Sequence, residues 1–204
     1  MIAFEPVVLT GEHVRLEPLA AAHVPGLVIA AAEDRSTYDL SPVPDGEAEF
    51  RWHVDFAERE RAAGRRLVFA TVSVAENRPV GSTSFLDPQR WPGGPGDRLL
   101  DCIEIGATWL AASAQRTVVN TEAKLLMLDH AFDVLDVHRV VLNTDARNER
   151  SRAAIARIGA TFEGVLHGFR YGVEGTPRDT ATFAIRARDW PEVRARLTRR
   201  LERR

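Results

Sequence analysis

The chain has 204 residues, of which 45% are hydrophobic and 27% charged, so it can bury the core of one folded domain. This composition excludes a disordered protein, and a single cysteine, Cys102, excludes a disulfide-stapled scaffold. With 27 basic and 29 acidic residues the net charge is −2, which does not favour nucleic-acid binding. A signal peptide and a membrane-spanning stretch are both missing from the pattern, so we expect a cytoplasmic protein.

Hydrophobic spacing and turn residues predict the elements of the first half of the chain. A short strand, two amphipathic helices, a β-hairpin and a Gly/Pro-rich loop follow one another at Val14–Leu19, Val24–Ala31, Glu47–Ala63, Leu67–Val74 with Val80–Leu86, and Asp87–Arg98.

In the second half, strands and helices alternate. The predicted elements are strand Leu99–Leu110, helix Thr121–Leu135, strand Val137–Thr144, helix Asn148–Ile158, and strands Thr161–Leu166 and Thr180–Ile185. Gly159 is placed to end the second of these helices in a left-handed conformation. The predicted order is therefore β α α β β β α β α β β.

The strand that ends at Leu110 leads through the small residues Ala111–Ala114 into the clearest helix of the sequence. Such a junction presents free backbone N–H groups and the positive end of a helix dipole, which suit a phosphate group. The alternative is an ordinary junction in which Asn120 or Thr121 caps the helix. These residues alone leave both interpretations open.

The residues that follow bear on the choice between a phosphate-binding junction and an ordinary one. A strand ending in Asn143 leads to Asn148-Glu149-Arg150-Ser151 on a helix, and then to Gly159-Ala160-Thr161-Phe162 at the next strand. Together with Glu104-Ile105-Gly106-Ala107-Thr108-Trp109-Leu110 and the opening Val14–Leu19, this pattern resembles the GCN5-related N-acetyltransferases (GNAT), especially the RimJ/RimL-like branch that acetylates ribosomal proteins. The resemblance covers roughly Leu9–Ala187.

The resemblance implies an α/β (α+β) fold of the GNAT type. In that fold about seven strands form a mixed sheet with about four flanking helices, and two parallel central strands splay apart around a CoA cleft. We therefore expect an acyltransferase domain over residues 9–187. Residues 188–204 form an arginine-rich helix or tail outside it, since Arg186–Arg204 holds eight arginines and three acidic residues.

The resemblance also implies acetyl-CoA as acyl donor. Its pantetheine arm is expected along the strands that end at Leu110 and Asn143, and its pyrophosphate at the amides of residues 116–120. Asn148 corresponds to the asparagine that binds the pantetheine arm, although it could equally be a helix cap. The implied cofactor-binding residues are Thr108, Trp109, Leu110, Gln115, Arg116, Thr117, Val118, Val119, Asn120, Thr121, Asn143, Asn148 and Ser151.

Val118 departs from the family pattern, which has glycine at the centre of the phosphate loop. A β-branched residue does not readily adopt a positive φ, and its side chain keeps a phosphate at a distance. If Val118 has helical geometry, its N–H still points at the ligand and only the closest approach is lost. A loop that no longer binds phosphate is the alternative.

Direct acetyl transfer to an amine needs a base, a donor to the developing oxyanion and a proton for the leaving thiolate. Glu104, a carboxylate on a mostly apolar strand, is the candidate base, and a structural carboxylate paired with an arginine is the alternative. Ser151, one turn after Asn148, corresponds to the residue near the CoA sulfur. The single lysine, Lys124, is not expected to be catalytic, and the histidine and cysteine spacing indicates no metal site.

The acceptor pocket is expected from the two early helices, residues 87–98 and residues 167–177. Trp52, Trp91, Phe85 and Tyr171 are candidate wall residues, or else core and loop residues. The partners implied are acetyl-CoA and an amine acceptor, either a protein N-terminus or a small molecule, with a homodimer left open. The alternatives are a non-catalytic acyl-CoA-binding module, a succinyl-CoA-type acyltransferase, and a nucleic-acid-associated protein that uses the arginine tail.

Overall fold

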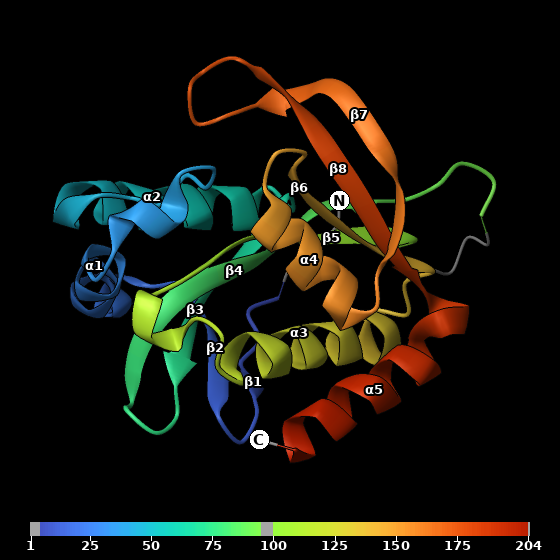
Figure 1. Ribbon diagram of the computed structural model, residues 1–204, viewed down its shortest axis with the longest axis horizontal. Helices are drawn as coiled ribbons and strands as arrows, with labels where there is room; N and C mark the ends of the chain where they lie inside the picture. Colours follow the sequence, from blue (N-terminus) through green and yellow to red (C-terminus); the bar gives the residue numbers. More distant parts are fainter. Residues whose placement is uncertain (1–4, 95–99, 204) are drawn as a thin grey trace.

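A single sheet organises the molecule. The computed structural model describes residues 5–94 and 100–203. Within that range eight strands lie side by side in the order β1-β2-β3-β4-β5-β6-β8-β7 (Figure 1). Their bounds are β1 Leu9–Thr10, β2 Val14–Pro18, β3 Arg66–Ser73, β4 Arg78–Gln89, β5 Cys102–Leu110, β6 Arg139–Asp145, β7 Thr161–Tyr171 and β8 Pro177–Arg186.

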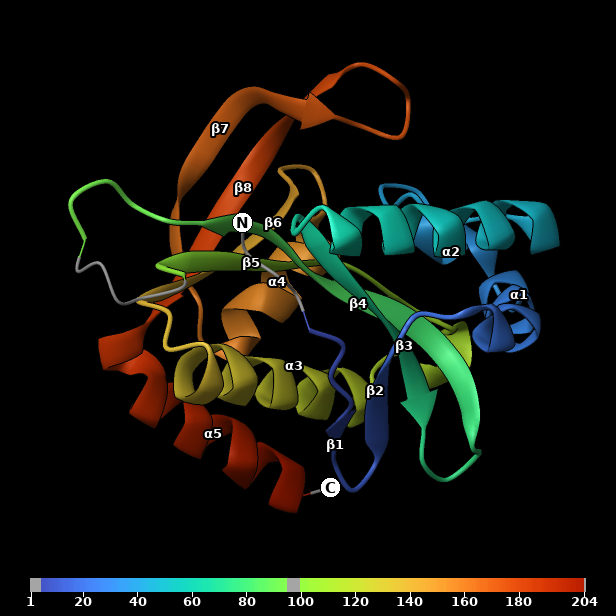
Figure 2. The ribbon, with the colours of Figure 1, turned by 180° about the vertical axis from the view of Figure 1, so that it is seen from behind.

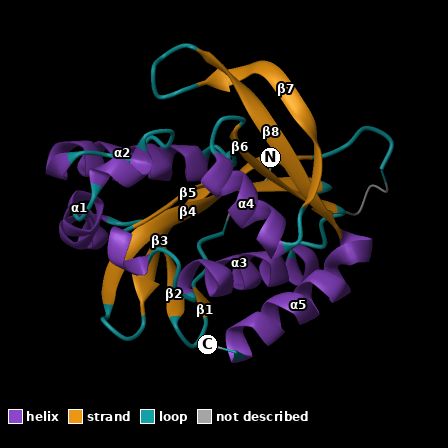
Figure 3. Ribbon diagram, viewed as in Figure 1, coloured by secondary structure: helices purple, strands orange, loops and turns teal. Residues whose placement is uncertain are grey.

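Helices cover both faces of the sheet. They are α1 Val24–Ala32, α2 Gly46–Ala62, α3 Val119–Asp129, α4 Glu149–Ile158 and α5 Trp190–Glu202. The view from behind shows α2 in front of the sheet, whereas α4 lies in front of it in the opposite view (Figures 2 and 3). Side-chain contacts agree, because Trp109 packs on Phe50 of α2 on one face and Phe85 packs on His130, just after α3, on the other.

The only parallel neighbours in the described sheet are β5 and β6, and they separate after a short stretch. Their register pairs Cys102 with Arg139, Ile103 with Val140 and Glu104 with Val141, and it ends there. Strand β6 continues to pair with β8 as far as Asp145, and β5 continues to pair with β4 as far as Leu110. The facing edges of β5 and β6 beyond Glu104 therefore have no strand between them.

Local residue chemistry sets the ends of α4. The side-chain oxygen of Asn148 accepts a hydrogen bond from the amide of Ser151, which satisfies one free donor of the first turn. Gly159 ends the helix with a φ of 116°, a conformation that an L side chain rarely adopts. Both features are as the sequence predicts.

Helix α3 is held by segments from opposite parts of the chain. The Glu122 carboxylate, in its first turn, accepts hydrogen bonds from the amides of Glu12, His13 and Val14 at 2.7 to 2.9 Å. Helix α5 packs on the other side through Trp190, Val193 and Leu197, which are all buried. The N-terminal hairpin and α5 thus fix the position of α3 on the sheet.

The structure differs from the expected elements mainly in their lengths. The additional strand β1 gives eight strands in place of about seven, and α5, the fifth helix, is the helix that was one alternative for residues 188–204. Strand β4 runs to Gln89, inside the expected loop, and β7 runs to Tyr171. Helix α3 begins two residues earlier than expected and continues into a π-helical turn, His130–Val134. Leu99 and the part of the Gly/Pro-rich loop after Gly94 lie outside the described residues.

Candidate functional site

Strand β5 carries a bulge in its pairing with β4, just beyond the point where β6 separates from it. Two residues, Ala107 and Thr108, lie opposite Thr83 of β4, and Ala107 has a φ of 48°. This bulge turns Thr108 toward α3 and Trp109 toward α2, so neither side chain fills the space between β5 and β6. Of the three residues predicted along the pantetheine arm, Thr108 and Trp109 can therefore contribute backbone groups only.

Leu110, the third of these residues, has its carbonyl oxygen occupied. It accepts hydrogen bonds from the Tyr38 hydroxyl and from Nε2 of Gln115, each at 3.0 Å. Gln115 Nε2 also donates to the Thr37 hydroxyl at 3.1 Å. The Gln115 side chain thus joins β5 to residue 37, and its amide nitrogen is not directed at a ligand.

The first turn of α3 forms the expected cluster of free amides. Within the described chain, the amides of Thr117, Val118, Asn120 and Thr121 have no hydrogen-bond acceptor, whereas the amide of Val119 donates to the Thr117 hydroxyl at 3.2 Å. Val118 has helical φ and ψ angles of −70° and −24°. The left-handed residue of the loop is Arg116, with a φ of 62°. A valine in place of glycine therefore imposes no backbone strain at position 118.

Glu104 is a buried carboxylate, 5% exposed, beside the point where β5 and β6 separate. Its Oε2 atom accepts hydrogen bonds from Asn143 Nδ2 at 2.7 Å and from the Arg170 guanidinium at 2.8 Å. Arg170 also forms an ion pair with Asp87, at the end of β4. No hydrogen bond to Oε1 of Glu104 is found in the described chain, so this oxygen can accept a proton.

Burial raises the pKa of Glu104 above its usual value, because removal from water penalises the carboxylate. The positive charge of Arg170 and the hydrogen bond from Asn143 lower this pKa and so limit the rise, whereas the negative charge of Asp87 adds to it. The two interpretations of Glu104 in the sequence are thus compatible, since a carboxylate paired with an arginine still has a raised pKa.

The role of the Asn143 side chain could not be read from the sequence. The residue was expected to contribute to the cofactor edge of β6, but its amide nitrogen binds Glu104, 39 positions away in the chain. Its Oδ1 atom is buried and has no hydrogen-bond partner, and the same holds for Oδ1 of Asn120 in the first turn of α3. Unpaired buried polar atoms at two separate points of the site favour a polar ligand there.

The first turn of α4 completes this side of the site. Asn148 and Ser151 lie together there, and Asn148 is the helix cap. No hydrogen bond from the Ser151 hydroxyl is found among residues 5–94 and 100–203. Arg150 reaches out of α4 to donate to the carbonyl oxygen of Thr37 at 2.6 Å. Thr37 is therefore contacted both by Gln115 and by α4.

Three of the candidate wall residues are at the surface, and one is not. Trp52, Trp91 and Tyr171 are exposed, with Tyr171 76% exposed at the end of β7. Phe85 is a core residue, the alternative that the sequence left open for it, because it is 1% exposed and packs against Phe69 and His130 on the α3 face.

A hollow of about 290 Å³ lies beside the Glu104 cluster on the α2 side of the molecule. It is lined by Glu60, Gly64, Arg65, Arg66, Asp87 and Pro88. Asp87 belongs both to this hollow and to the ion pair with Arg170, so the hollow adjoins the carboxylates that could attract an amine.

A metal site and a membrane-spanning helix were also sought in the described residues. Among residues 5–94 and 100–203, no group of His, Cys, Asp and Glu side chains is arranged to hold a metal ion. No helix in those residues has the length and apolar character needed to cross a membrane.

Comparison with known proteins identifies the class. The family described as the Acetyltransferase (GNAT) domain matches residues 13–161. Since this match covers well over half of the chain, the protein belongs to the GNAT acetyltransferase family. The family and the mixed α/β fold with parallel β5 and β6 strands, both predicted from the sequence, are confirmed.

Individual relatives share the fold to different extents. A GCN5-related N-acetyltransferase from Brucella melitensis is 30% identical, with a TM-score of 0.80 over 95% of this chain and 85% of that protein. RimJ from Mycobacterium smegmatis, whose structure is a complex with CoA-disulfide, is 23% identical, with a TM-score of 0.76 over 95% and 91%. YdaF of Bacillus subtilis (strain 168), named as a candidate ribosomal N-acetyltransferase, is 32% identical over 87 residues, which are 43% of this chain and 46% of YdaF.

Proposed function

We propose that this protein transfers an acetyl group from acetyl-CoA directly to a primary amine, and that the preferred acceptor is the α-amino group of a protein N-terminus. The observation that carries the proposal is the separation of β5 from β6 immediately beyond the buried carboxylate of Glu104. The divergence leaves strand edges free to bind an extended chain of amide groups, and the carboxylate lies where an incoming amine must lose a proton.

The residues present fit acetyl-CoA, which supplies the acetyl group as a reactive thioester. The free amides of Thr117, Val118, Asn120 and Thr121 suit the pyrophosphate, aided by the dipole of α3. The unpaired oxygens of Asn120 and Asn143 are acceptors for polar hydrogens of the same ligand. In this arrangement the backbone edges of Thr108–Leu110 and of β6 hold the pantetheine arm.

In the proposed reaction Glu104 is the base, through its free Oε1 oxygen. An acceptor amine arrives protonated and must lose a proton before its nitrogen can attack the thioester carbonyl. A carboxylate with a raised pKa takes that proton more readily than an ordinary glutamate. Arg170 and Asn143 hold the other carboxylate oxygen, which fixes the orientation of Oε1.

Ser151 is proposed to act on the leaving group. When the C–N bond forms and the C–S bond breaks, the thiolate needs a hydrogen-bond donor or a proton. The Ser151 hydroxyl lies in the first turn of α4, next to the cap residue Asn148, and its hydrogen is available for this contact. With the pKa of a simple alcohol it suits hydrogen bonding or relay through water better than direct acid catalysis.

The acceptor preference rests on the carboxylates beside the hollow and on the relatives. Asp87 lines the hollow, and Arg170 joins it to Glu104, so an amine that enters there meets carboxylate oxygens that accept its hydrogen bonds. The name of YdaF points to ribosomal proteins as acceptors. A small-molecule amine, a larger acyl donor such as succinyl-CoA, and acyl-CoA binding without transfer are the alternatives.

Thiol release from acetyl-CoA, measured over a panel of N-terminal peptides and small amines, tests the proposal. We expect turnover with peptides and a loss of at least 100-fold in kcat for Glu104→Gln, with CoA binding kept. Glu58→Gln, which changes an exposed carboxylate of α2 in the same way, is the matched control and should leave kcat unchanged. CoA binding without transfer to any acceptor would favour the non-catalytic module instead.

A further inference from the structure

Helix α5 runs antiparallel to α3. The indole nitrogen of Trp190 donates to Asp133 at 3.3 Å, and one turn later Arg194 pairs with Asp129 at 2.7 Å. Moving forward four residues in α5, from Trp190 to Arg194, therefore corresponds to moving back four residues, from Asp133 to Asp129, in α3 and the turn that follows it. Continuing this register places Arg200 level with Ala123 and Arg203 level with Asn120, roughly 9 and 13 Å along the helix from Arg194 at about 1.5 Å per residue.

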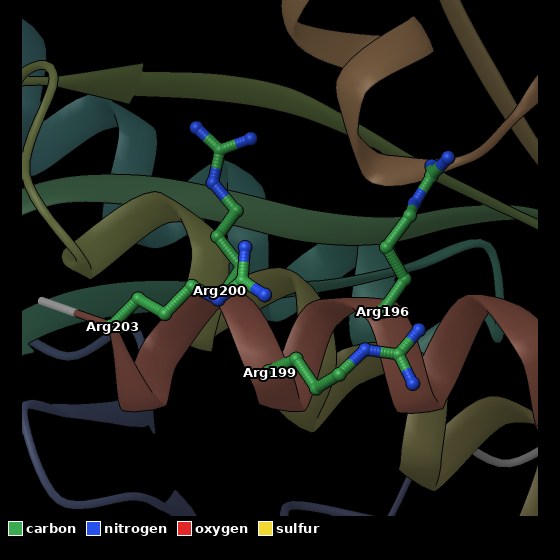
Figure 4. A pocket seen from close by; sticks show the side chains of 4 residues that line it. All are labelled: Arg196, Arg199, Arg200 and Arg203. Carbon is green, nitrogen blue, oxygen red and sulfur yellow. The ribbon is translucent and has the colours of Figure 1, made fainter.

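Arginines gather on this end of α5. Arg196, Arg199, Arg200 and Arg203 line a shallow hollow of about 360 Å³. Figure 4 shows Arg196 and Arg200 projecting to the same side of α5, while the side chain of Arg203 runs along the helix toward Arg200. Arg196 already donates to the carbonyl oxygen of Arg157 at the end of α4. Figure 4 also shows the side chain of Arg199 running along α5 away from Arg200, so the two side chains left together near the C-terminal end of the helix are Arg200 and Arg203.

These charges differ from most other arginines of the molecule, which pair with a carboxylate, as Arg51 does with Glu47 and Arg65 with Glu60. Within the described chain no carboxylate forms an ion pair with Arg199, Arg200 or Arg203. One or two cations near the end of a helix are favoured by its dipole, but four neighbouring arginines repel one another. Such a concentration of unpaired guanidinium groups is suited to an anion with several oxygens, above all a phosphate.

We propose that Arg200 and Arg203 bind the 3′-phosphate of the acyl-CoA. This inference deepens the proposed function and rests on it, because it starts from a pyrophosphate at the first turn of α3. In CoA the 5′-pyrophosphate and the 3′-phosphate are attached to the same ribose, so the second phosphate must lie within a few bonds of the first. Among the described residues, the α5 register brings Arg203 level with that turn and Arg200 about one helical turn away from it, and neither pairs with a carboxylate.

The proposal assigns α5 a role in binding acyl-CoA. The family match ends at residue 161, well before α5, so the match assigns nothing to these arginines. Buried Trp190, Val193 and Leu197 fix the helix on α3, which holds the arginines at a constant level relative to the amides of the first turn. Main-chain amides would then bind one phosphate group and guanidinium groups the other.

The test compares CoA with 3′-dephospho-CoA, which lacks only the 3′-phosphate. Dissociation constants are measured by calorimetry for the full chain, the double variant Arg200→Ala/Arg203→Ala, and the control Arg188→Ala/Arg186→Ala. The control removes the same charge near the opposite end of α5. For the wild-type protein we expect CoA to bind about 10- to 100-fold more tightly than 3′-dephospho-CoA, a ratio typical of losing charge-assisted hydrogen bonds to a phosphate.

The double variant should lower this ratio to within about threefold of one by weakening CoA binding alone, and the control should keep the wild-type ratio. Equal binding of the two ligands by the wild-type protein, or an unchanged ratio in the double variant, would overturn the proposal. An equal decrease in both variants would also overturn it, because it would show a general effect of net charge.

Binding is measured without an acceptor, so the proposed acetyl transfer can fail while this inference holds. In the converse case, active transfer with equal use of acetyl-CoA and its 3′-dephospho form refutes the inference alone. If the double variant instead loses affinity for RNA with an unchanged CoA ratio, the arginines serve a polyanionic partner and the proposal is wrong.

Discussion

Replacing Lys124 with methionine is expected to stabilise the protein near neutral pH and to remove part of the pH dependence of its stability. Lys124 is the only lysine of the chain and is 4% exposed in α3. Its Nζ atom donates to the hydroxyls of Thr83 at 2.9 Å and Thr108 at 2.7 Å, and no carboxylate pairs with it in the described chain. Burial without a counter-charge lowers its pKa from 10.5 to about 7.

The size of the effect follows from this pKa. A tenfold change in proton affinity is worth about 1.4 kcal/mol, so folding at pH 7 costs about 4 to 5 kcal/mol at this residue. Methionine removes the cost but also two hydrogen bonds, worth about 1 kcal/mol each. The net gain expected at pH 7 is therefore roughly 2 to 3 kcal/mol.

The sign of the pH dependence is also fixed. Between about pH 7 and pH 10.5 the unfolded chain holds the lysine proton and the folded chain does not, so the wild-type free energy of unfolding rises with pH. The slope from this residue is about 1.4 kcal/mol per pH unit, and below pH 7 it disappears. The advantage of Lys124→Met should shrink accordingly as the pH rises.

Urea unfolding of both proteins at pH 6, 7, 8, 9 and 10 measures this difference. Subtracting the two free energies removes the contributions of Cys102 and Tyr38, whose pKa values burial raises in both proteins. Thr83→Val, which removes a partner of Lys124 but no titrating group, is the control and should keep the rise with pH. A constant difference between wild type and Lys124→Met from pH 6 to 10 would refute the reasoning, since it would mean that Lys124 stays charged.

Four further outcomes are expected. Arg170→Met should move the acidic limb of the pH profile of kcat/KM to higher pH by roughly one unit, because the cation that lowers the pKa of Glu104 is lost while burial still raises it. Gly106→Ala should lower kcat at least tenfold with little change in circular dichroism, because the new methyl group would lie 2.9 Å from Oε1 of Glu104. An unchanged kcat would argue against a role for that oxygen. Val118→Gly should leave the dissociation constant of CoA within threefold and reduce the free energy of unfolding by about 1 kcal/mol, since the backbone at this position is already helical. Glu122→Ala should reduce the free energy of unfolding by about 3 to 5 kcal/mol in urea titrations, because three amides of the N-terminal hairpin lose a charged acceptor, and a loss under 1 kcal/mol would contradict this account.

Features with a local sequence cause were predictable. The helix cap at Asn148 depends only on residues next to it in the chain, and so does the helix end at Gly159. Both were placed correctly. The start of α3 was set two residues late, because Val118-Val119 is β-branched and its helical geometry depends on packing against the sheet. Strand β7 extends to Tyr171 because it pairs with β8, a partner that its own mostly exposed residues do not indicate.

The arrangement around Glu104 shows where sequence reasoning stops. The carboxylate was correctly selected as a buried acidic group, but its partners Asn143 and Arg170 lie 39 and 66 positions away. Arg170 lies on a strand whose register only the folded sheet defines. Lys124 shows the same limit, because a lysine on a helix is normally exposed and nothing near it in the chain indicates complete burial.

The attachment of α3 by Glu122 and by α5 has a consequence for how the molecule forms during synthesis. The helix receives hydrogen bonds from residues about 110 positions earlier and packs against a helix that begins some 60 positions later. Once α3 has emerged from the ribosome it can bind the N-terminal hairpin, which emerged earlier, whereas α5 emerges only later. Assembly of this helix environment is thus ordered in time, with α5 added last, and chains cut short before residue 190 would keep the amides of the first turn but lose the arginines beside them.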